Sequence, residues 1–205
     1  MRKKFIIKFK KKVVWRFRSL FHLFQIYKLF TLCNELNYSL VKKDPNFPFI
    51  KFGSDFDIYV ENIEMFNNKI VKFFRNKKKY KTTTNAIEDG NLQTDLFYND
   101  KFIYKFDLYN NCFISDQHNT IFITDVINKS QMFKFYFFKE FEIKVPNSKM
   151  DTIVRIFEIK KHPSKQHHLT LLKNTSKNLI RDIKIEINIY SDKSFDEIFN
   201  LIDQK

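Results

Sequence analysis

The feature that most constrains the fold is the stretch FGSDFDIYV at residues 52–60, where carboxylates alternate with apolar side chains. Alternate residues of a β-strand lie on the same face of the sheet, so Asp55 and Asp57 would share one face, with Cα atoms roughly 7 Å apart. The other face would carry the apolar residues Phe56, Ile58 and Val60. The pattern predicts a strand whose apolar side builds the core while its other side presents two carboxylates.

Two carboxylates this close together favour a metal site. Like charges at short range repel each other unless a cation neutralises them. Mg²⁺ commonly binds one or two carboxylates together with substrate phosphates. The chemistry that such a site favours is phosphoryl or nucleotidyl transfer. The alternative is an exposed strand face on which both aspartates are simply solvated.

A metal site of this kind usually has a third carboxylate, and the predicted hairpin of residues 92–109 offers Asp95 and Asp107. With a two-residue turn at the hairpin tip, Asp95 would pair with Tyr104 and Asp107 would lie opposite Leu92. Strand alternation would then put the two aspartates on opposite faces. The face of Asp107 is the more polar, so we predict Asp107 as the third carboxylate.

The remaining patterns predict an α+β domain over residues 1–146, followed by a helical C-terminal segment over residues 147–205. Helices are expected over residues 19–37, from Ile63 into the charged run at residues 75–79, from Ser148 as an N-cap, and through most of residues 164–205. Strands are expected over residues 38–41, 49–60, 80–87, 92–98, 101–109, 120–126 and 133–145.

The composition predicts a folded core, and it explains the positive charge without nucleic-acid binding. There are 26 Phe residues among 205, while Gly occurs only twice and the formal net charge is +14. We interpret the lysine excess mainly as a composition bias and a solvated surface, so nucleic acid is an unlikely partner. The basic stretch at residues 1–24 could instead contact an anionic membrane surface.

The cellular location follows from two further features. No uncharged apolar run approaches the ~20 residues needed to span a bilayer. The two cysteines, Cys33 and Cys112, form no CxxC motif or disulfide framework. We therefore expect a cytoplasmic protein, peripheral at most to the inner face of the membrane.

The segment from Gly53 to Val60 resembles the GSDhDhhV signature of the nucleotidyltransferase superfamily, which has the polymerase β-like fold. The resemblance implies a mixed sheet flanked by helices. It also implies that Asp55 and Asp57 on one strand and Asp107 on a nearby strand hold Mg²⁺ and are the catalytic residues. The expected reaction is transfer of a nucleoside monophosphate to an acceptor.

Over roughly residues 20–172 the chain more closely resembles small nucleotidyltransferase-like proteins encoded among bacterial surface-polysaccharide genes. That resemblance implies a nucleoside triphosphate donor and a small acceptor such as a sugar or sugar phosphate. It also includes a Lys-x-x-His pair, here Lys165 and His168, which could contact a substrate phosphate.

The sequence departs from the family at its phosphate-binding Gly-Ser pair, which normally lies upstream of the first aspartate. The only Gly-Ser pair here is Gly53-Ser54, immediately before Asp55. We take Gly53 and Ser54, with the nearby Lys51, as candidate nucleotide contacts; Lys42 could reach a phosphate in the same way. The departure leaves open a catalytically inactive relative.

Three other interpretations remain. A glycosyltransferase with an Asp-x-Asp motif would use a nucleotide-sugar, although such enzymes usually have a longer nucleotide-binding region before that motif. A non-catalytic module would dock through its basic face to nucleic acid or membrane. The histidines at residues 162, 167 and 168 lie among lysines, which favours a solvated basic loop or a phosphate contact over a zinc site.

Overall fold

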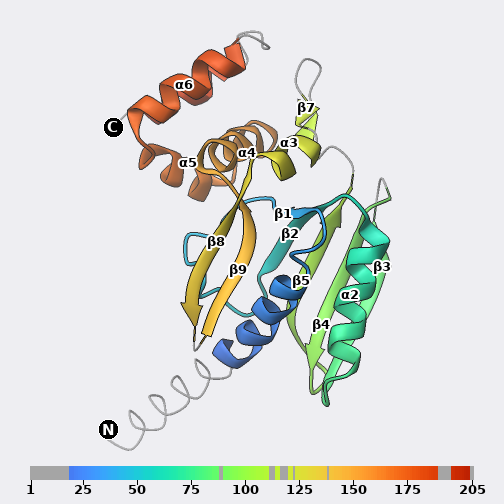
Figure 1. Ribbon diagram of the computed structural model, residues 1–205. Helices are drawn as coiled ribbons and strands as arrows, with labels where there is room; N and C mark the ends of the chain where they lie inside the picture. The colour runs from blue at the N-terminus through green and yellow to red at the C-terminus, as the bar shows by residue number, and fades with distance from the viewer. Residues whose placement is uncertain are drawn as a thin grey trace, which may run out of the picture.

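The computed structural model describes residues 19–87, 90–110, 114–115, 120–121, 123–137, 139–188 and 195–203 (Figure 1). Residues 1–18 of the basic stretch predicted to contact a membrane lie outside the described residues, and so does Cys112. Among the described residues, no helix is both long enough and apolar enough to cross a bilayer.

The centre of the fold is a five-stranded mixed sheet with the strand order β1-β2-β5-β4-β3 (Figure 1). The pair β2–β5 is parallel and the other neighbours are antiparallel. The strands are β1 (Tyr38–Leu40), β2 (Asp55–Val60), β3 (Tyr80–Ala86), β4 (Leu92–Tyr98) and β5 (Lys101–Tyr109). With helices flanking this sheet, the predicted α+β class with a mixed sheet is confirmed.

Strand β2 is shorter than the predicted strand at residues 49–60. Gly53 has a φ of +80°, in the left-handed region where glycine is favoured because it lacks a Cβ. Its backbone N–H donates to the carbonyl of Ile103, 2.8 Å away. The chain therefore turns at Gly53 and enters the sheet at Asp55.

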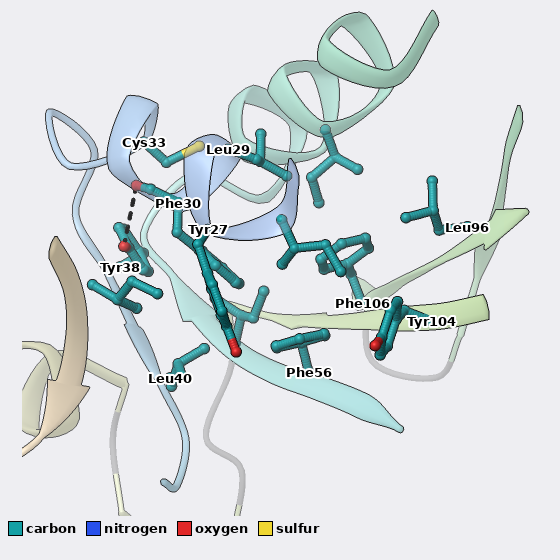
Figure 2. Packing of buried hydrophobic residues seen from close by; sticks show 14 of the residues in the cluster. Tyr27, Leu29, Phe30, Cys33, Tyr38, Leu40, Phe56, Leu96, Tyr104 and Phe106 are labelled. Atoms are coloured by element: carbon teal, nitrogen blue, oxygen red, sulfur yellow. Dashed lines mark hydrogen bonds between the residues drawn. The ribbon is translucent and has the colours of Figure 1, made fainter. Parts of the chain in front are cut away.

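Two helices cover the apolar face of the sheet. One spans residues 19–32 among the described residues, ending before the predicted residue 37, and the other is α2 (Ile63–Arg75). Figure 2 shows Phe56 of β2 and Phe106 of β5 facing Phe30 of the first helix. The free cysteine Cys33 is buried in the same cluster. The apolar half of the alternating pattern thus builds the main core.

Two predicted strands differ from the structure in extent. The chain at residues 133–145 forms a hairpin of two strands, β8 (Ser130–Phe137) and β9 (Lys139–Pro146). Its arms share one alternating pattern with no Gly or Pro between them, so the sequence has no turn signal. Residues 120–126 instead contain β7 (Thr120–Ile121), which pairs with β6 (Ile114–Ser115), and then α3 (Ile123–Asn128). Val126 is buried against the C-terminal helices, and this tertiary contact outweighs the local β propensity.

The described residues of the C-terminal segment are largely helical, as predicted. It contains α4 (Ser148–Lys161), α5 (Gln166–Lys173), α6 (Lys177–Asn188) and α7 (Asp196–Asp203). The N-cap of α4 is Asn147 and not the predicted Ser148, because the Asn147 side chain accepts from the backbone N–H of Met150 at 2.9 Å. These helices form a second core that includes Tyr59 from β2.

Candidate active site

The parallel pairing of β2 with β5 brings the three predicted aspartates together. In the register of the two strands, Asp57 lies beside Asp107 and Asp55 lies beside Lys105. Neighbouring strands are about 4.8 Å apart, and paired residues point to the same face. Asp55 is exposed, Asp57 is half-buried and Asp107 is only 7% exposed. The exposure of the three carboxylates therefore falls from Asp55 at the surface to Asp107 in the interior.

The predicted hairpin register is wrong by one residue. A β-bulge between Leu96 and Phe97 shifts the pairing of β4 and β5, so that Gln93 lies opposite Asp107 and Asp95 opposite Lys105. Asp95 and Asp107 consequently share one face, because a bulge adds a residue to one strand only. Asp107 is nearer to Asp57 because β5, and not β4, is the neighbour of β2.

Two lysines form ion pairs with the three carboxylates. The Lys105 Nζ lies 3.2 Å from Asp55 Oδ2 and 2.9 Å from Asp107 Oδ2. The Lys42 Nζ lies 3.1 Å from Asp57 Oδ2. Burial would lower the pKa of each lysine, but the adjacent carboxylates outweigh it and raise the pKa. Both ammonium groups therefore stay charged at neutral pH and offset the negative charge of the aspartates.

The surroundings of Asp107 raise its pKa. Its burial raises the pKa, the ion pair with Lys105 opposes the rise, and the charges of Asp57 and Asp55 add to it. Tyr109, on the same strand face, directs its hydroxyl at Asp57 Oδ1 over 3.5 Å. The pKa of this hydroxyl is raised by burial and by the nearby carboxylates. Tyr109 is therefore a neutral donor at the edge of the site.

The carboxylates have the donor chemistry that Mg²⁺ requires. Asp107 Oδ1 is buried and has no hydrogen-bond partner among the described residues, and an unpaired buried carboxylate oxygen is costly. No three His, Cys, Asp or Glu side chains in the described part of the chain already converge as metal ligands. The ammonium group of Lys105 lies between Asp55 and Asp107, so a metal there would require this side chain to withdraw.

A second, buried layer of charged groups lies behind the aspartates. Glu158 of α4 is 2% exposed, and its Oε1 accepts from the Lys42 Nζ at 2.5 Å. Its Oε2 lies 2.6 Å from the His168 Nε2 of α5. Burial alone would raise the pKa of Glu158, but His168 and Lys42 lower it to about 2. Glu158 is therefore ionised and joined through Lys42 to Asp57.

Both ring nitrogens of His168 lie close to charged side chains. Its Nδ1 lies 3.2 Å from a guanidinium nitrogen of Arg155, and arginine can only donate, so Nδ1 accepts. Its Nε2 lies 2.6 Å from Glu158 Oε2. Lys165, the other member of the predicted phosphate-binding pair, is more exposed and lies 3.8 Å from Glu158.

A pocket of about 120 Å³ opens beside Asp55 and Asp57. Its charged and polar wall includes Lys42, Lys43, Asp44, Arg155, His167 and His168, and its apolar wall is Leu40, Pro45, Phe47, Ile50 and Phe56. Pockets for whole ligands are usually ~300 Å³ or larger. This pocket has room for one part of a substrate, such as a phosphate group or a single ring.

The other predicted nucleotide contacts lie at the entrance to β2. Gly53 provides the turn described above, Ser54 is half-buried, and Lys51 is exposed. None of the three lines the pocket. The sequence analysis singled out none of Lys105, Glu158 and Arg155. The roles of Glu158 and Arg155 depend on how the C-terminal helices pack.

No family model and no curated protein sequence matches this chain. A crystal structure from H. pylori, of a protein provisionally described as a nucleotidyltransferase, aligns with 90% of this chain and 93% of its own. The sequence identity is 10% and the TM-score is 0.45. At this level of similarity, only the residues of the site bear on the function.

Proposed function

We propose that this protein is a Mg²⁺-dependent enzyme of the nucleotidyltransferase type, which transfers a nucleoside monophosphate, or a related phosphoryl group, to a small acceptor. The observation that carries the proposal is the register of β2 and β5. It gathers Asp55, Asp57 and Asp107 on one face, and it leaves one buried oxygen of Asp107 without a partner.

Each carboxylate has a role that follows from its surroundings. Asp55 and Asp57 would hold Mg²⁺ from the more exposed side and Asp107 from the buried side. The bound ion would neutralise the charge on the transferred phosphoryl group. Asp107 would also serve as the general base, because a raised pKa suits that role. Its carboxylate would take the proton from the acceptor hydroxyl.

The donor in this proposal is a nucleoside triphosphate, and the acceptor is a sugar or sugar phosphate on the way to a surface polysaccharide. The acceptor rests on the sequence resemblance. The reaction would take place in the cytoplasm, where nucleoside triphosphates are available.

The test is thermal stabilisation of the purified protein by each nucleoside triphosphate and by nucleotide-sugars, with and without Mg²⁺. The wild type is compared with Asp57→Asn and with the matched control Asp95→Asn, which removes a carboxylate from the same face one strand farther away. We expect Mg²⁺-dependent stabilisation that is lost in Asp57→Asn and kept in Asp95→Asn. Stabilisation by nucleotide-sugars alone would point to a glycosyltransferase instead.

One observation favours a second candidate, a non-catalytic binding module. Lys42 and Lys105 already pair with all three aspartates, so the site is partly neutralised by the protein itself. This candidate predicts that ligands bind equally well with and without Mg²⁺, and that Asp57→Asn does not weaken that binding.

A further inference from the structure

We propose that Lys42 is the residue that binds the polyphosphate of the substrate, and that Glu158 and His168 are positioning residues which hold its ammonium group beside Asp57. This assignment rests on the proposed function for the identity of the nucleotide. The anion site itself rests only on the contacts of Lys42.

The first step concerns the hydrogen-bonding capacity of Lys42. An ammonium group has three N–H donors. Two are directed at Asp57 Oδ2, at 3.1 Å, and at Glu158 Oε1, at 2.5 Å. The side chain is 22% exposed and lines the pocket beside the aspartates. Its third donor is therefore available to a ligand in that pocket.

The second step is that the fold holds Lys42 through contacts of its side chain and of the backbone of the next residue. Glu158 is held in turn by His168, 2.6 Å away, on a different helix. The backbone of the next residue, Lys43, donates to Asp151 Oδ1 at 2.9 Å and accepts from Arg155 at 2.5 Å. Because these contacts hold the ammonium group of Lys42 in place before a ligand binds, less conformational entropy is lost on binding.

The third step compares Lys42 with the other cations of the pocket wall. The guanidinium of Arg155 donates to Asp151, to the Lys43 carbonyl and to His168. The Lys43 Nζ lies 3.9 Å from the centre of the Phe133 ring. Of these three cations, only Lys42 contacts a predicted metal ligand in the described part of the chain. A lysine ammonium is a compact point charge that suits phosphate oxygens, so a polyphosphate is the ligand class that fits.

The experiment is titration calorimetry of the full chain with inorganic tripolyphosphate and with a nucleoside triphosphate, both in the presence of Mg²⁺. The variants are Lys42→Met, Lys42→Arg and Lys72→Met. Lys72 is an exposed lysine of α2, on the other side of the sheet. We expect Lys42→Met to weaken tripolyphosphate binding about tenfold to a hundredfold. Lys42→Arg should recover part of this loss, and Lys72→Met should bind like the wild type.

A double-mutant cycle separates positioning from general structural support. Glu158→Gln should weaken tripolyphosphate binding in the wild-type background and have little further effect when Lys42→Met is already present. Equal losses in both backgrounds would overturn the positioning role of Glu158. Wild-type affinity in a well-folded Lys42→Met protein would overturn the proposal as a whole.

The two proposals can fail separately. If tripolyphosphate binding depends on Lys42 but no nucleotide binds, the anion site stands and nucleotidyl transfer fails. If nucleotide binding depends on Mg²⁺ and Asp57 but not on Lys42, nucleotidyl transfer stands and the assignment of Lys42 fails.

Discussion

Replacing Glu158 with Gln tests the buried network of Lys42, Glu158 and His168, because the stability that Glu158 contributes should depend on pH. The pKa of Glu158 is about 2 in the folded protein against an ordinary value of 4.5. Because Glu158 is only 2% exposed, little solvent screening applies. The difference corresponds to about 3 kcal/mol of stability at pH 7. Glu158→Gln removes the charge and keeps the size of the side chain, so the variant should be less stable by about that amount.

The sign of the pH dependence follows from the lowered pKa. A carboxyl whose pKa falls on folding stabilises the protein above its unfolded pKa, and that stabilisation is lost as the pH falls toward the folded pKa. The difference in unfolding free energy between wild type and Glu158→Gln should therefore stay near 3 kcal/mol from pH 7 to about pH 5.5. It should shrink to about 1 kcal/mol at pH 3.

The measurement is urea unfolding of both proteins at a series of pH values between 7 and 3, followed by circular dichroism. Glu64→Gln is the control, because Glu64 is exposed in the first turn of α2 and should change stability by less than about 1 kcal/mol. A gap that is below 1 kcal/mol at pH 7, or that widens as the pH falls, would refute the reasoning.

Three further predictions concern single contacts. Lys105→Met should lower the melting temperature in the absence of metal, because Asp55 and Asp107 lose their common partner. The same variant should bind Mg²⁺ more tightly in calorimetry, and an unchanged Mg²⁺ affinity would contradict this prediction. Asn147→Ala should destabilise the protein by about 1 kcal/mol through loss of the α4 cap, whereas Ser148→Ala should have a smaller effect in the same urea assay. Gly53→Ala should lower the free energy of unfolding by about 1–2 kcal/mol, because alanine is strained at the positive φ of Gly53. An added Cβ would meet no other atom within 4 Å, so the loss comes from φ alone, and a neutral result in the urea assay would show that the turn relaxes.

The sequence by itself determined the local features of this protein. The alternation in DFDIYV identified β2, the shared face of Asp55 and Asp57, and the apolar side that packs in the core. The periodicity of apolar residues located α2 and the helical C-terminal segment. These predictions succeeded because neighbouring residues in a strand or helix have fixed relative directions, whatever the rest of the chain does.

Only the tertiary structure decided what stands next to those aspartates. The strand that neighbours β2 is β5, which begins more than forty residues later, and the bulge in the β4–β5 pair reversed the predicted facing of Asp95. Lys42 and Glu158 are 116 residues apart in sequence yet share a hydrogen bond. Strand order and helix packing are set by burial of many apolar side chains at once, so no local pattern encodes them.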